Sequence, residues 1–281
     1  MTYYESFSEQ GRNYTIEGVL DYFNERIRVD SYTGNLQAII NRTEQLAEQH
    51  SLSKLILKGK YEHLSSLILS GYTLEAIIPL YFQGQAAYFF TKYRKNDRRN
   101  SMFWIQEDEI VRNVKAQQDT KAKEVPPSFV LRLATEKDAE ALAQLFRHVF
   151  QVYPTPLDSP EYIQKTMRED TIYYVYTAND QIVSTASAEM NCLQGNAELT
   201  NCATILEFRK HGLMKQLLIA LEKELCMRHI YCAYTIARAL SYGMNAAFYQ
   251  IGYSYTGRLV NNCYIFDKME DMNVWAKDLS Q

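Results

Sequence analysis

The apolar positions of the C-terminal part of the chain follow two periods, which predict alternating helices and strands. Apolar residues recur at helical spacing in residues 136–150, namely Ala139, Leu142, Leu145, Phe146 and Phe150. A second short helix is expected over residues 160–168. The stretch "TIYYVYTANDQIVSTASAEM" (171–190) has the composition of two strands joined by an Asn-Asp turn. Further strands are predicted over residues 129–135 and 196–206.

A long amphipathic helix is predicted directly after Gly212. Its apolar stripe consists of Met214, Leu217, Leu218, Leu221 and Leu225. A strand over residues 231–240, a short helix that ends at Gly252 and two final strands complete the pattern. The order β-α-α-β-β-β-α-β-α-β-β predicts an α/β (α+β) fold, in which a mixed sheet has helices on both faces.

The N-terminal part has a shorter version of the same pattern. A hairpin is predicted over residues 14–29, a helix over 35–50, a strand at "KLILKG", a helix that ends at Gly71 and a hairpin around Gln83-Gly84. The succession helix, Gly-Tyr, strand, turn, strand occurs at Gly71-Tyr72 and again at Gly252-Tyr253. It indicates a degenerate internal repeat, although helix-Gly-aromatic-strand is also a common way to turn a corner.

A polar segment separates the two parts. "KAQQDTKAKEVPPSF" (115–129) carries charges of both signs and ends in Pro126-Pro127, which cannot continue a helix or lie inside a sheet. We therefore predict a smaller N-terminal domain over residues 1–125 and a second domain over residues 126–281.

Composition excludes several classes of protein. A net charge of −3 and a pI near 6.0 argue against a nucleic-acid-binding surface spread over the whole protein. The five cysteines are odd in number and form no CxxC pair, which argues against a disulfide framework and a zinc site. No apolar run approaches the roughly 20 residues of a membrane span, and the N-terminus lacks the pattern of a signal peptide. We expect a soluble cytoplasmic protein.

Three basic residues precede the long helix: Arg209, Lys210 and His211, followed by Gly212. The first N–H groups of a helix have no partners within the helix, and the helix dipole adds positive charge there. A strand, a basic loop, a glycine and a helix therefore form a candidate phosphate site. The alternative is a helix start with basic surface residues only. The loop is neither GxxxxGK[ST] nor GxGxxG, so neither a P-loop nor a Rossmann site is indicated.

"FRKHGLM" and "SYGMNAAFYQIGY" (241–253) resemble two signatures of the Gcn5-related N-acetyltransferase (GNAT) superfamily. The first matches at Arg209 and Gly212 and departs at Met214, where the superfamily has a small residue. The resemblance covers residues 129–281 and implies acetyl-CoA as cosubstrate, with no metal; the first domain would then be a degenerate GNAT-like copy. It implies cofactor contacts from Thr204, Ile205, Leu206, Arg209, Lys210, His211, Gly212, Leu213, Met214, Ser241, Asn245 and Phe248.

A closer resemblance is to the beta-lysine N-acetyltransferase family. It is carried by "NERIRV" (24–29), "VYPTPL" (152–157), "NAELTNCAT" (196–204), "YTIARALSYGMN" (234–245), "GRLVNNC" (257–263) and "EDMNVW" (270–275). It implies transfer of acetyl from acetyl-CoA to the terminal amine of beta-lysine, a small-molecule substrate, to give a compatible solute. The alternatives are a GNAT enzyme that acts on a polyamine, antibiotic or protein amine, and a non-catalytic acyl-CoA-binding module.

An attacking amine must lose a proton, because a lysine-type amine has a pKa of roughly 10.4. Strand alternation places Glu198, Thr200 and Cys202 on one face, which makes Glu198 the first candidate base and Glu189 the second. The alternative is that Glu198 only attracts the ammonium group. Cys202 is expected to be structural.

A proton donor to the leaving thiolate is harder to predict. Phe248 stands where the superfamily usually has a tyrosine, so Tyr242 and Ser241 remain as candidates.

Substrate contacts are expected from the closely matching phrases. Arg238 and Arg258 are candidates to hold a carboxylate, since guanidinium binds carboxylate bidentately, although both could be surface residues. Tyr153 and Asp158 could contact the amine, or could belong to a rigid proline-rich turn. The N-terminal half could cover the cleft, form a homodimer or stabilise its neighbour.

Overall fold

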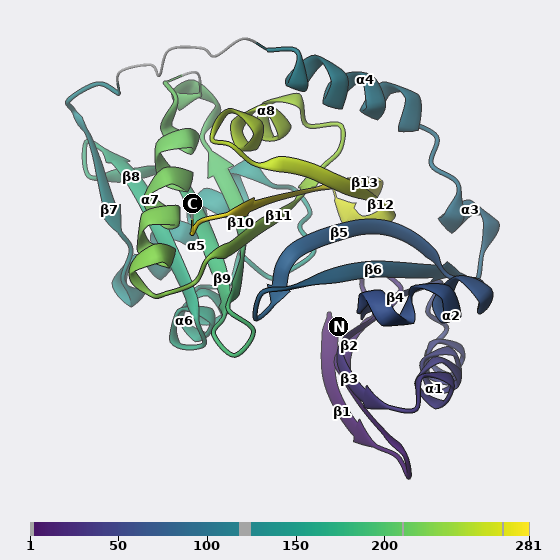
Figure 1. The fold of residues 1–281 in the computed structure, drawn as a ribbon. Helices are drawn as coiled ribbons and strands as arrows, with labels where there is room; N and C mark the ends of the chain where they lie inside the picture. The colour runs from purple at the N-terminus through teal and green to yellow at the C-terminus, as the bar shows by residue number, and fades with distance from the viewer. Residues whose placement is uncertain (1–2, 118–124, 210, 266, 281) are drawn as a thin grey trace.

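The computed structural model describes residues 3–117, 125–209, 211–265 and 267–280. The described strands form one continuous 13-stranded sheet with the order β1-β2-β3-β4-β6-β5-β12-β13-β11-β10-β9-β8-β7. Both halves of the chain therefore share a sheet, and they meet where β5 pairs with β12 (Figure 1). The predicted mixed sheet with helices on both faces is confirmed.

The N-terminal half contains six strands and four α-helices among the described residues. The strands are β1 (Tyr4–Gln10), β2 (Tyr14–Asp21), β3 (Arg26–Gly34), β4 (Lys54–Gly59), β5 (Thr73–Phe82) and β6 (Gln85–Tyr93). The helices are α1 (Leu36–Gln49), α2 (Leu64–Leu69), α3 (Asn96–Arg99) and α4 (Trp104–Lys115). The pattern did not predict β1, α3 or α4.

The C-terminal half follows the predicted order. Its strands are β7 (Phe129–Leu133), β8 (Thr171–Ala178), β9 (Gln181–Asn191), β10 (Asn196–Thr204), β11 (Cys232–Arg238), β12 (Ser254–Ile265) and β13 (Lys268–Asp278). Its helices are α5 (Ala139–Val149), α6 (Pro160–Arg168), α7 (Leu213–Met227) and α8 (Tyr242–Gln250). The predicted linker includes residues 118–124, which lie outside the described residues.

The two halves repeat one topology. Strands β1, β2 and β3 form an antiparallel meander, α1 crosses to β4 parallel to β3, and after α2 the hairpin β5–β6 adds β6 beside β4. Strands β8, β9 and β10, helix α7, strand β11, helix α8 and the hairpin β12–β13 repeat each step with the same strand directions. This correspondence favours the internal repeat over a chance reuse of one corner motif.

The Gly-Tyr corner seen in the sequence is built alike in both halves. Gly71 has a φ of 84° and Gly252 a φ of 93°, left-handed conformations that favour glycine after a helix. The tyrosines that follow, Tyr72 and Tyr253, are both buried.

A lysine from the last strand of each half braces this corner. Lys92 Nζ donates to Ser70 O at 2.9 Å and to Glu44 of α1 at 2.7 Å. Lys277 Nζ donates to Ile251 O at 2.7 Å and to Glu222 of α7 at 2.8 Å. The equivalent contacts fix the correspondence of residues between the halves.

The halves join at a close approach of backbones. Gly257 of β12 pairs with Ala76 of β5, and a Cβ at Gly257 would lie 2.2 Å from Glu75 O. The φ of 149° at Gly257 is also one that other residues rarely adopt. Only glycine fits this junction without a shift of the main chain.

Buried cations add to the junction. Arg26 Nη1 donates to Asn262 O at 3.0 Å, and Lys54 Nζ donates to Val260 O at 2.7 Å. Lys54 is fully buried, and its ion pair with Glu75 supplies the compensation that a buried charge requires. The two halves are therefore tied together by both sheet pairing and buried polar contacts.

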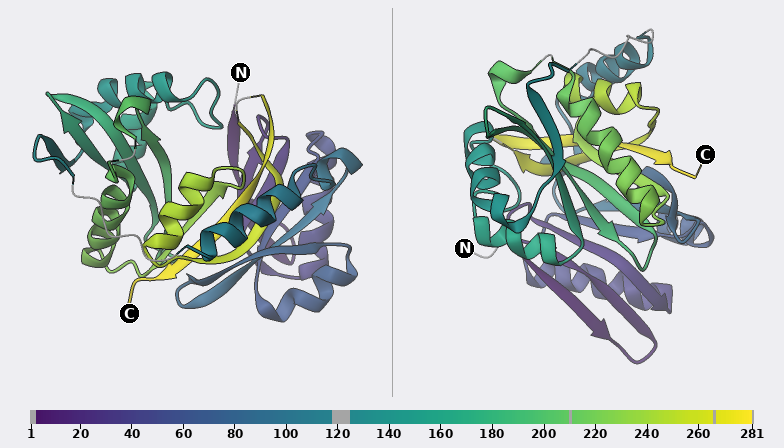
Figure 2. Two further views of the ribbon diagram at one scale, coloured as in Figure 1. Left: turned by 90° about the horizontal axis from the view of Figure 1, so that it is seen from above. Right: turned by 90° about the vertical axis from the view of Figure 1, so that its left-hand side faces the viewer.

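Two helix layers cover the C-terminal part of the sheet. Helix α7 packs on one face, over a core that includes Ala188 and Leu199, and α5 packs on the other, over a core that includes Tyr173 and Ala203. Figure 2 shows the two layers and the neighbouring N-terminal half from two further directions. Side chains alternate along a strand, and Leu199 of β10 points toward α7. The side chain of Glu198, the residue before it, therefore points away from α7.

Candidate active site

Helix α7 begins as the phosphate-cradle prediction requires. Gly212 precedes it with a φ of 75°, and no side chain caps the helix start. Its first N–H groups are therefore left for an external anion. Leu213 is buried in the core beneath them and Met214 packs partly against that core.

The basic loop before α7 has its own contacts. Arg209 Nε donates to Thr204 O at 3.1 Å, and the ring of His211 lies 5.6 Å from that of Phe129. Lys210 lies outside the described residues. Arg209 therefore bridges the end of β10 to the loop that leads into the helix.

Strands β10 and β11 separate beside this loop. They pair in parallel only from Asn196 to Glu198 with Cys232 to Tyr234, whereas β10 continues along β9 to Thr204. The main-chain groups of residues 199–204 on the β11 side are then an open strand edge, which an extended ligand can join as an added strand. Ile205 and Leu206 follow at the end of this edge, in the region predicted to hold the pantetheine arm.

The predicted contacts on α8 divide into exposed and buried residues. Ser241 precedes the helix, and the exposed Tyr242 accepts a hydrogen bond from Gln117. Asn245 and Phe248 are completely buried. The prediction that these two contact the cofactor finds no support here, because both side chains point into the protein core.

Asn245 has a structural role that explains its burial. Its Nδ2 donates to Arg238 O at 3.0 Å and Ser241 O at 2.8 Å, and its Oδ1 accepts from Asn273 and Trp275 at 2.8 Å each. These bonds satisfy the buried amide and connect β11, α8 and β13.

Two carboxylates lie side by side at the centre of the site. Glu198 of β10 is the direct antiparallel partner of Glu189 of β9, so the two side chains project from the same face. Glu189 is accessible to solvent, although many protein atoms surround it. Desolvation, and then the charge of Glu198, raise the pKa of Glu189 to about 7.

The surroundings of Glu198 favour its ionised form more than those of Glu189 do. Desolvation raises its pKa, whereas the charges of Lys58, Arg28 and Arg26 and a hydrogen bond from Tyr234 lower it. All three cations come from the N-terminal half. The pair is therefore placed to hold one proton and one negative charge near neutral pH.

A β-bulge follows the pair. The register of β10 against β9 shifts between Thr200 and Ala203, and Asn201 has a φ of 51°. Asn201 Nδ2 donates to Ser187 Oγ at 2.9 Å and to Glu189 Oε1 at 3.3 Å. The bulge thus directs an amide toward the carboxylate pair.

Cys202, in the same bulge, is not poised as a nucleophile. Burial raises the pKa of its thiol to about 12. The thiol stays protonated at neutral pH, in agreement with the structural role predicted for it.

The loop between α5 and α6 forms one wall of the cleft. Tyr153 OH donates to Asn201 Oδ1 at 3.4 Å, which places Tyr153 beside the bulge; its contact with substrate stays a prediction. Tyr153 and the exposed Asp158 also line a cavity of about 440 Å³, together with Tyr3 and Phe150. Asp158 O accepts from Arg147 at 2.5 Å, so this end of the loop is anchored to α5.

The two predicted carboxylate-binding arginines have partners within the protein. Arg258 pairs with Glu107 and Asp108 of α4 at 3.4 and 2.9 Å and is 10% exposed. Arg238 pairs with the buried Glu270 at 2.7 Å. The prediction of a substrate contact finds no support for Arg258, which holds α4 against β12.

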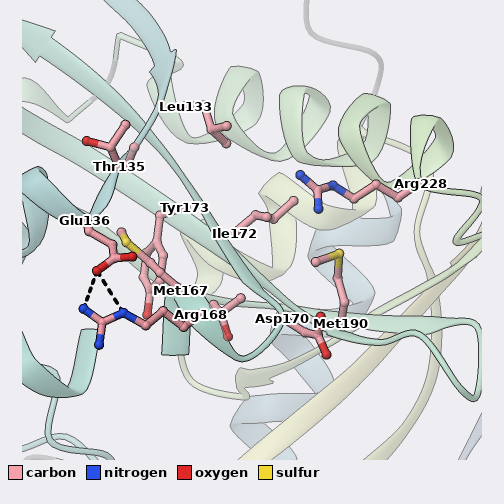
Figure 3. A pocket seen from close by; sticks show the side chains of 12 residues that line it. Leu133, Thr135, Glu136, Met167, Arg168, Asp170, Ile172, Tyr173, Met190 and Arg228 are labelled. Atoms are coloured by element: carbon pink, nitrogen blue, oxygen red, sulfur yellow. Dashed lines mark hydrogen bonds and ion pairs between the residues drawn. The ribbon is translucent and has the colours of Figure 1, made fainter. Parts of the chain in front are cut away.

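A second hollow lies away from the carboxylate pair (Figure 3). It lies between the end of β7, α6 and the start of β8, where Arg168 pairs with Glu136 and Arg228 extends from the end of α7. None of the predicted site residues lines it.

The sequence did not identify the basic residues opposite Glu198. Arg26 and Arg28 lie in "NERIRV", a phrase noted only as a resemblance, and Lys58 lies in a strand with no motif. The pairing of β5 with β12 brings these residues to the site from the other half of the chain. The resemblance of "NERIRV" was therefore the one signal in the sequence that could have pointed to them.

The chain is similar to several known acetyltransferases. The model of the acetyltransferase (GNAT) domain matches residues 130–255. The chain is 36% identical to the N-acetyltransferase YodP of Bacillus subtilis, over 94% of this chain and 97% of that protein. It is also 36% identical to a beta-lysine N(6)-acetyltransferase of Methanosarcina mazei, over 88% of this chain and 99% of that protein.

A beta-lysine N(6)-acetyltransferase of Methanococcus maripaludis is 34% identical over 90% of this chain and 93% of its own length. Among solved structures, the ribosomal-protein-S18-alanine N-acetyltransferase of Escherichia coli matches with a TM-score of 0.48 and 20% identity, over 54% of this chain and 95% of that one. Within the described residues, no helix is long and apolar enough to cross a membrane. The chain belongs to the family of GNAT-domain N-acetyltransferases that includes YodP and the beta-lysine N(6)-acetyltransferases.

Proposed function

We propose that this protein transfers the acetyl group of acetyl-CoA to the terminal amine of beta-lysine, giving N6-acetyl-beta-lysine. The observation that carries the proposal is the carboxylate pair Glu189–Glu198, which lies beside an open strand edge and an uncapped helix start. Two relatives that match over most of the chain are named for this reaction. A small amine with more than one positive charge suits a cleft that contains two carboxylates.

The residues at the start of α7 fit an acyl-CoA. Backbone N–H groups of Gly212, Leu213 and Met214 would hold its diphosphate, with Arg209 at the rim and the open edge of β10 beside the pantetheine arm. Acetyl-CoA supplies the acetyl group as a thioester, which is open to attack by a neutral amine. No metal has a part in this proposal.

The carboxylate pair prepares the amine. Glu198, held ionised by cations of the N-terminal half, attracts the substrate ammonium group. Glu189, whose pKa lies near 7, then accepts the proton. The structure thus favours the reverse of the order predicted from sequence, with Glu189 as base and Glu198 as electrostatic anchor.

The location, the partner, the product and the domain boundary are further parts of this proposal. We infer a cytoplasmic enzyme with a small-molecule amine as its partner and a product that serves as a compatible solute. We also retain the boundary near residue 125 between two GNAT-like domains. Tyr242 and Ser241, at the start of α8, remain the candidates to protonate the leaving thiolate.

The test is release of CoA thiol by the purified enzyme with acetyl-CoA and a panel of amines. We expect kcat/KM for beta-lysine to exceed the values for lysine and spermidine by at least about tenfold, the order of discrimination that polar substrate contacts supply. A higher kcat/KM for spermidine would mean that a polyamine, and not beta-lysine, is the substrate. Binding of acetyl-CoA without amine-dependent thiol release would overturn the enzyme assignment.

A further inference from the structure

The position of Arg28 in the N-terminal half is equivalent to that of Glu198. In the parallel pair β3–β4, Arg28 is opposite Ile56, and in the parallel pair β10–β11, Glu198 is opposite Tyr234. Each pair is the third of its ladder. The strand position that carries the substrate-facing carboxylate in one half therefore carries a cation in the other.

A cluster of two cations and one carboxylate surrounds Arg28. Arg28 donates from Nε and Nη2 to Asp30 at 2.7 and 3.0 Å, and Lys58 Nζ approaches Asp30 at 2.8 Å. The carboxylate of Asp30 neutralises one of these two cations, and the positive charge of the other acts on Glu198. Asp30, which Lys58 also holds, keeps the guanidinium in a fixed orientation, and this reduces the entropy lost when it binds an anion.

Contacts between side chains connect this cluster to the strand partner of Glu198. Lys58 Nζ donates to Tyr81 OH at 2.5 Å, and the ring of Tyr81 lies 5.5 Å from that of Tyr234, the strand partner of Glu198. The charges of Lys58 and Arg28 act directly on Glu198. The cluster therefore lies close to the carboxylate pair, although it comes from the other half of the chain.

Arg28 has the capacity to bind a ligand. Its side chain is 36% exposed, whereas that of Lys58 is 7% exposed. Among the residues that the structure describes, none hydrogen-bonds to its Nη1. Arg26, the other arginine nearby, is 12% exposed and is already bound to Asp21 and to Asn262 O.

We propose that Arg28 binds the carboxylate of the acetyl acceptor, so that the N-terminal half selects amino acids over amines that lack a carboxylate. The inference rests on the proposed function, since it assigns the acid end of the same substrate. The amine of the substrate lies at Glu189 and Glu198 on one side of the cleft, and its carboxylate lies at Arg28 on the other. A zwitterionic diamine matches both ends, whereas a polyamine has no carboxylate for Arg28 to bind.

The experiment compares beta-lysine with 3,6-diaminohexanamide, in which a neutral amide replaces the carboxylate. For the wild-type enzyme we expect kcat/KM to be about 10- to 100-fold higher for the acid, the range for a charge-assisted hydrogen-bonded pair. In Arg28→Met this ratio should fall close to 1, through a higher KM for beta-lysine with kcat changed by less than about threefold. Arg28→Lys keeps the positive charge but loses the pair of N–H donors that a guanidinium offers to a carboxylate, so it should give an intermediate ratio.

Arg42→Met is the matched control. Arg42 also holds a carboxylate with two nitrogens, that of Glu9, in the same half of the molecule but on α1. Its loss should leave the ratio unchanged.

Three outcomes would overturn the inference: a wild-type enzyme without preference for the acid, a folded Arg28→Met with the wild-type ratio, or equal losses for both substrates. The first outcome is measured on the wild-type enzyme, so the inference can be tested even if Arg28→Met does not fold. Acetylation of neither compound would instead refute the proposed function itself.

Discussion

Helices α1 and α7 occupy the same place in the two halves but begin differently. Asn35 caps α1, and its Oδ1 accepts a hydrogen bond from Ala38 N at 2.9 Å. Helix α7 has Gly212 in a left-handed conformation and no side-chain cap. The strand before α1 ends at Gly34, directly before the cap, whereas a basic loop separates Thr204 from α7. At the start of α1 a side chain accepts a hydrogen bond from a free backbone N–H group, whereas at the start of α7 no side chain does so.

The carboxylate pair differs between the halves in the same way. Glu198 and Glu189 are cross-strand partners in the C-terminal half, and the equivalent positions in the N-terminal half hold Arg28 and Val19. The two halves thus share a sheet topology, Gly-Tyr corners and bracing lysines but differ in the chemistry of these positions. We infer that one half binds the acyl donor and the reacting amine, and that the other supplies the opposite wall.

The largest expected effect is that of Glu189→Gln, which removes the base from the half that has one. We expect kcat to fall about 10²- to 10⁴-fold, the usual contribution of a general base. In the wild type the pKa of Glu189 is about 7, and a base must be ionised, so activity should decrease as the pH falls below 7. This limb should disappear from the pH profile of the variant, whereas Glu17→Gln in β2 should leave rate and profile unchanged.

Exchanging the helix starts should give an effect of intermediate size. A branched side chain at the left-handed Gly212 disturbs the backbone that holds the diphosphate, so we expect Gly212→Val to raise the KM for acetyl-CoA about 10- to 100-fold. Asn35→Ala, the matched change in α1, should cost about 1 kcal/mol of stability and leave that KM unaltered. An unchanged KM in a folded Gly212→Val would mean that the donor is held elsewhere.

The smallest expected difference concerns the bracing lysines. Lys277 pairs with Glu222, whose side chain is 12% exposed, and Lys92 pairs with Glu44, whose side chain is 40% exposed. Lys277→Met leaves the more buried carboxylate unpaired, so it should lower the free energy of unfolding by about 1–2 kcal/mol, against about 0.5 kcal/mol for Lys92→Met. Urea denaturation measures both, and equal losses would argue against this difference in burial as the cause.

The regular elements of this chain could be predicted from sequence because their signals are local. The stripe of α7, the Asn-Asp turn before β9 and the Gly-Tyr corners depend on residues close together in the chain. Helix α4 was missed because its buried face holds Glu107 as well as apolar residues, while Trp104 and Ile105 are exposed, which weakens the apolar period.

The active site was only half visible in the sequence for a related reason. Alternation along β10 predicts Glu198 as a site residue, and the GNAT signature predicts Gly212. Arg28 and Lys58 reach the cleft through the pairing of β5 with β12, a contact between distant parts of the chain that no local pattern encodes. The ion pair of Arg258 with α4 is equally non-local, and no pattern in the sequence predicted it.

The central claim is that the acceptor lies between the two halves and the donor lies on one of them. A crystal structure with CoA and beta-lysine bound tests it most directly. The account predicts the diphosphate at the main chain of residues 209–214, the terminal amine within hydrogen-bond reach of Glu189 or Glu198, and the carboxylate on Arg28. A diphosphate bound away from the start of α7, or an acceptor seated outside the cleft between the halves, would contradict it.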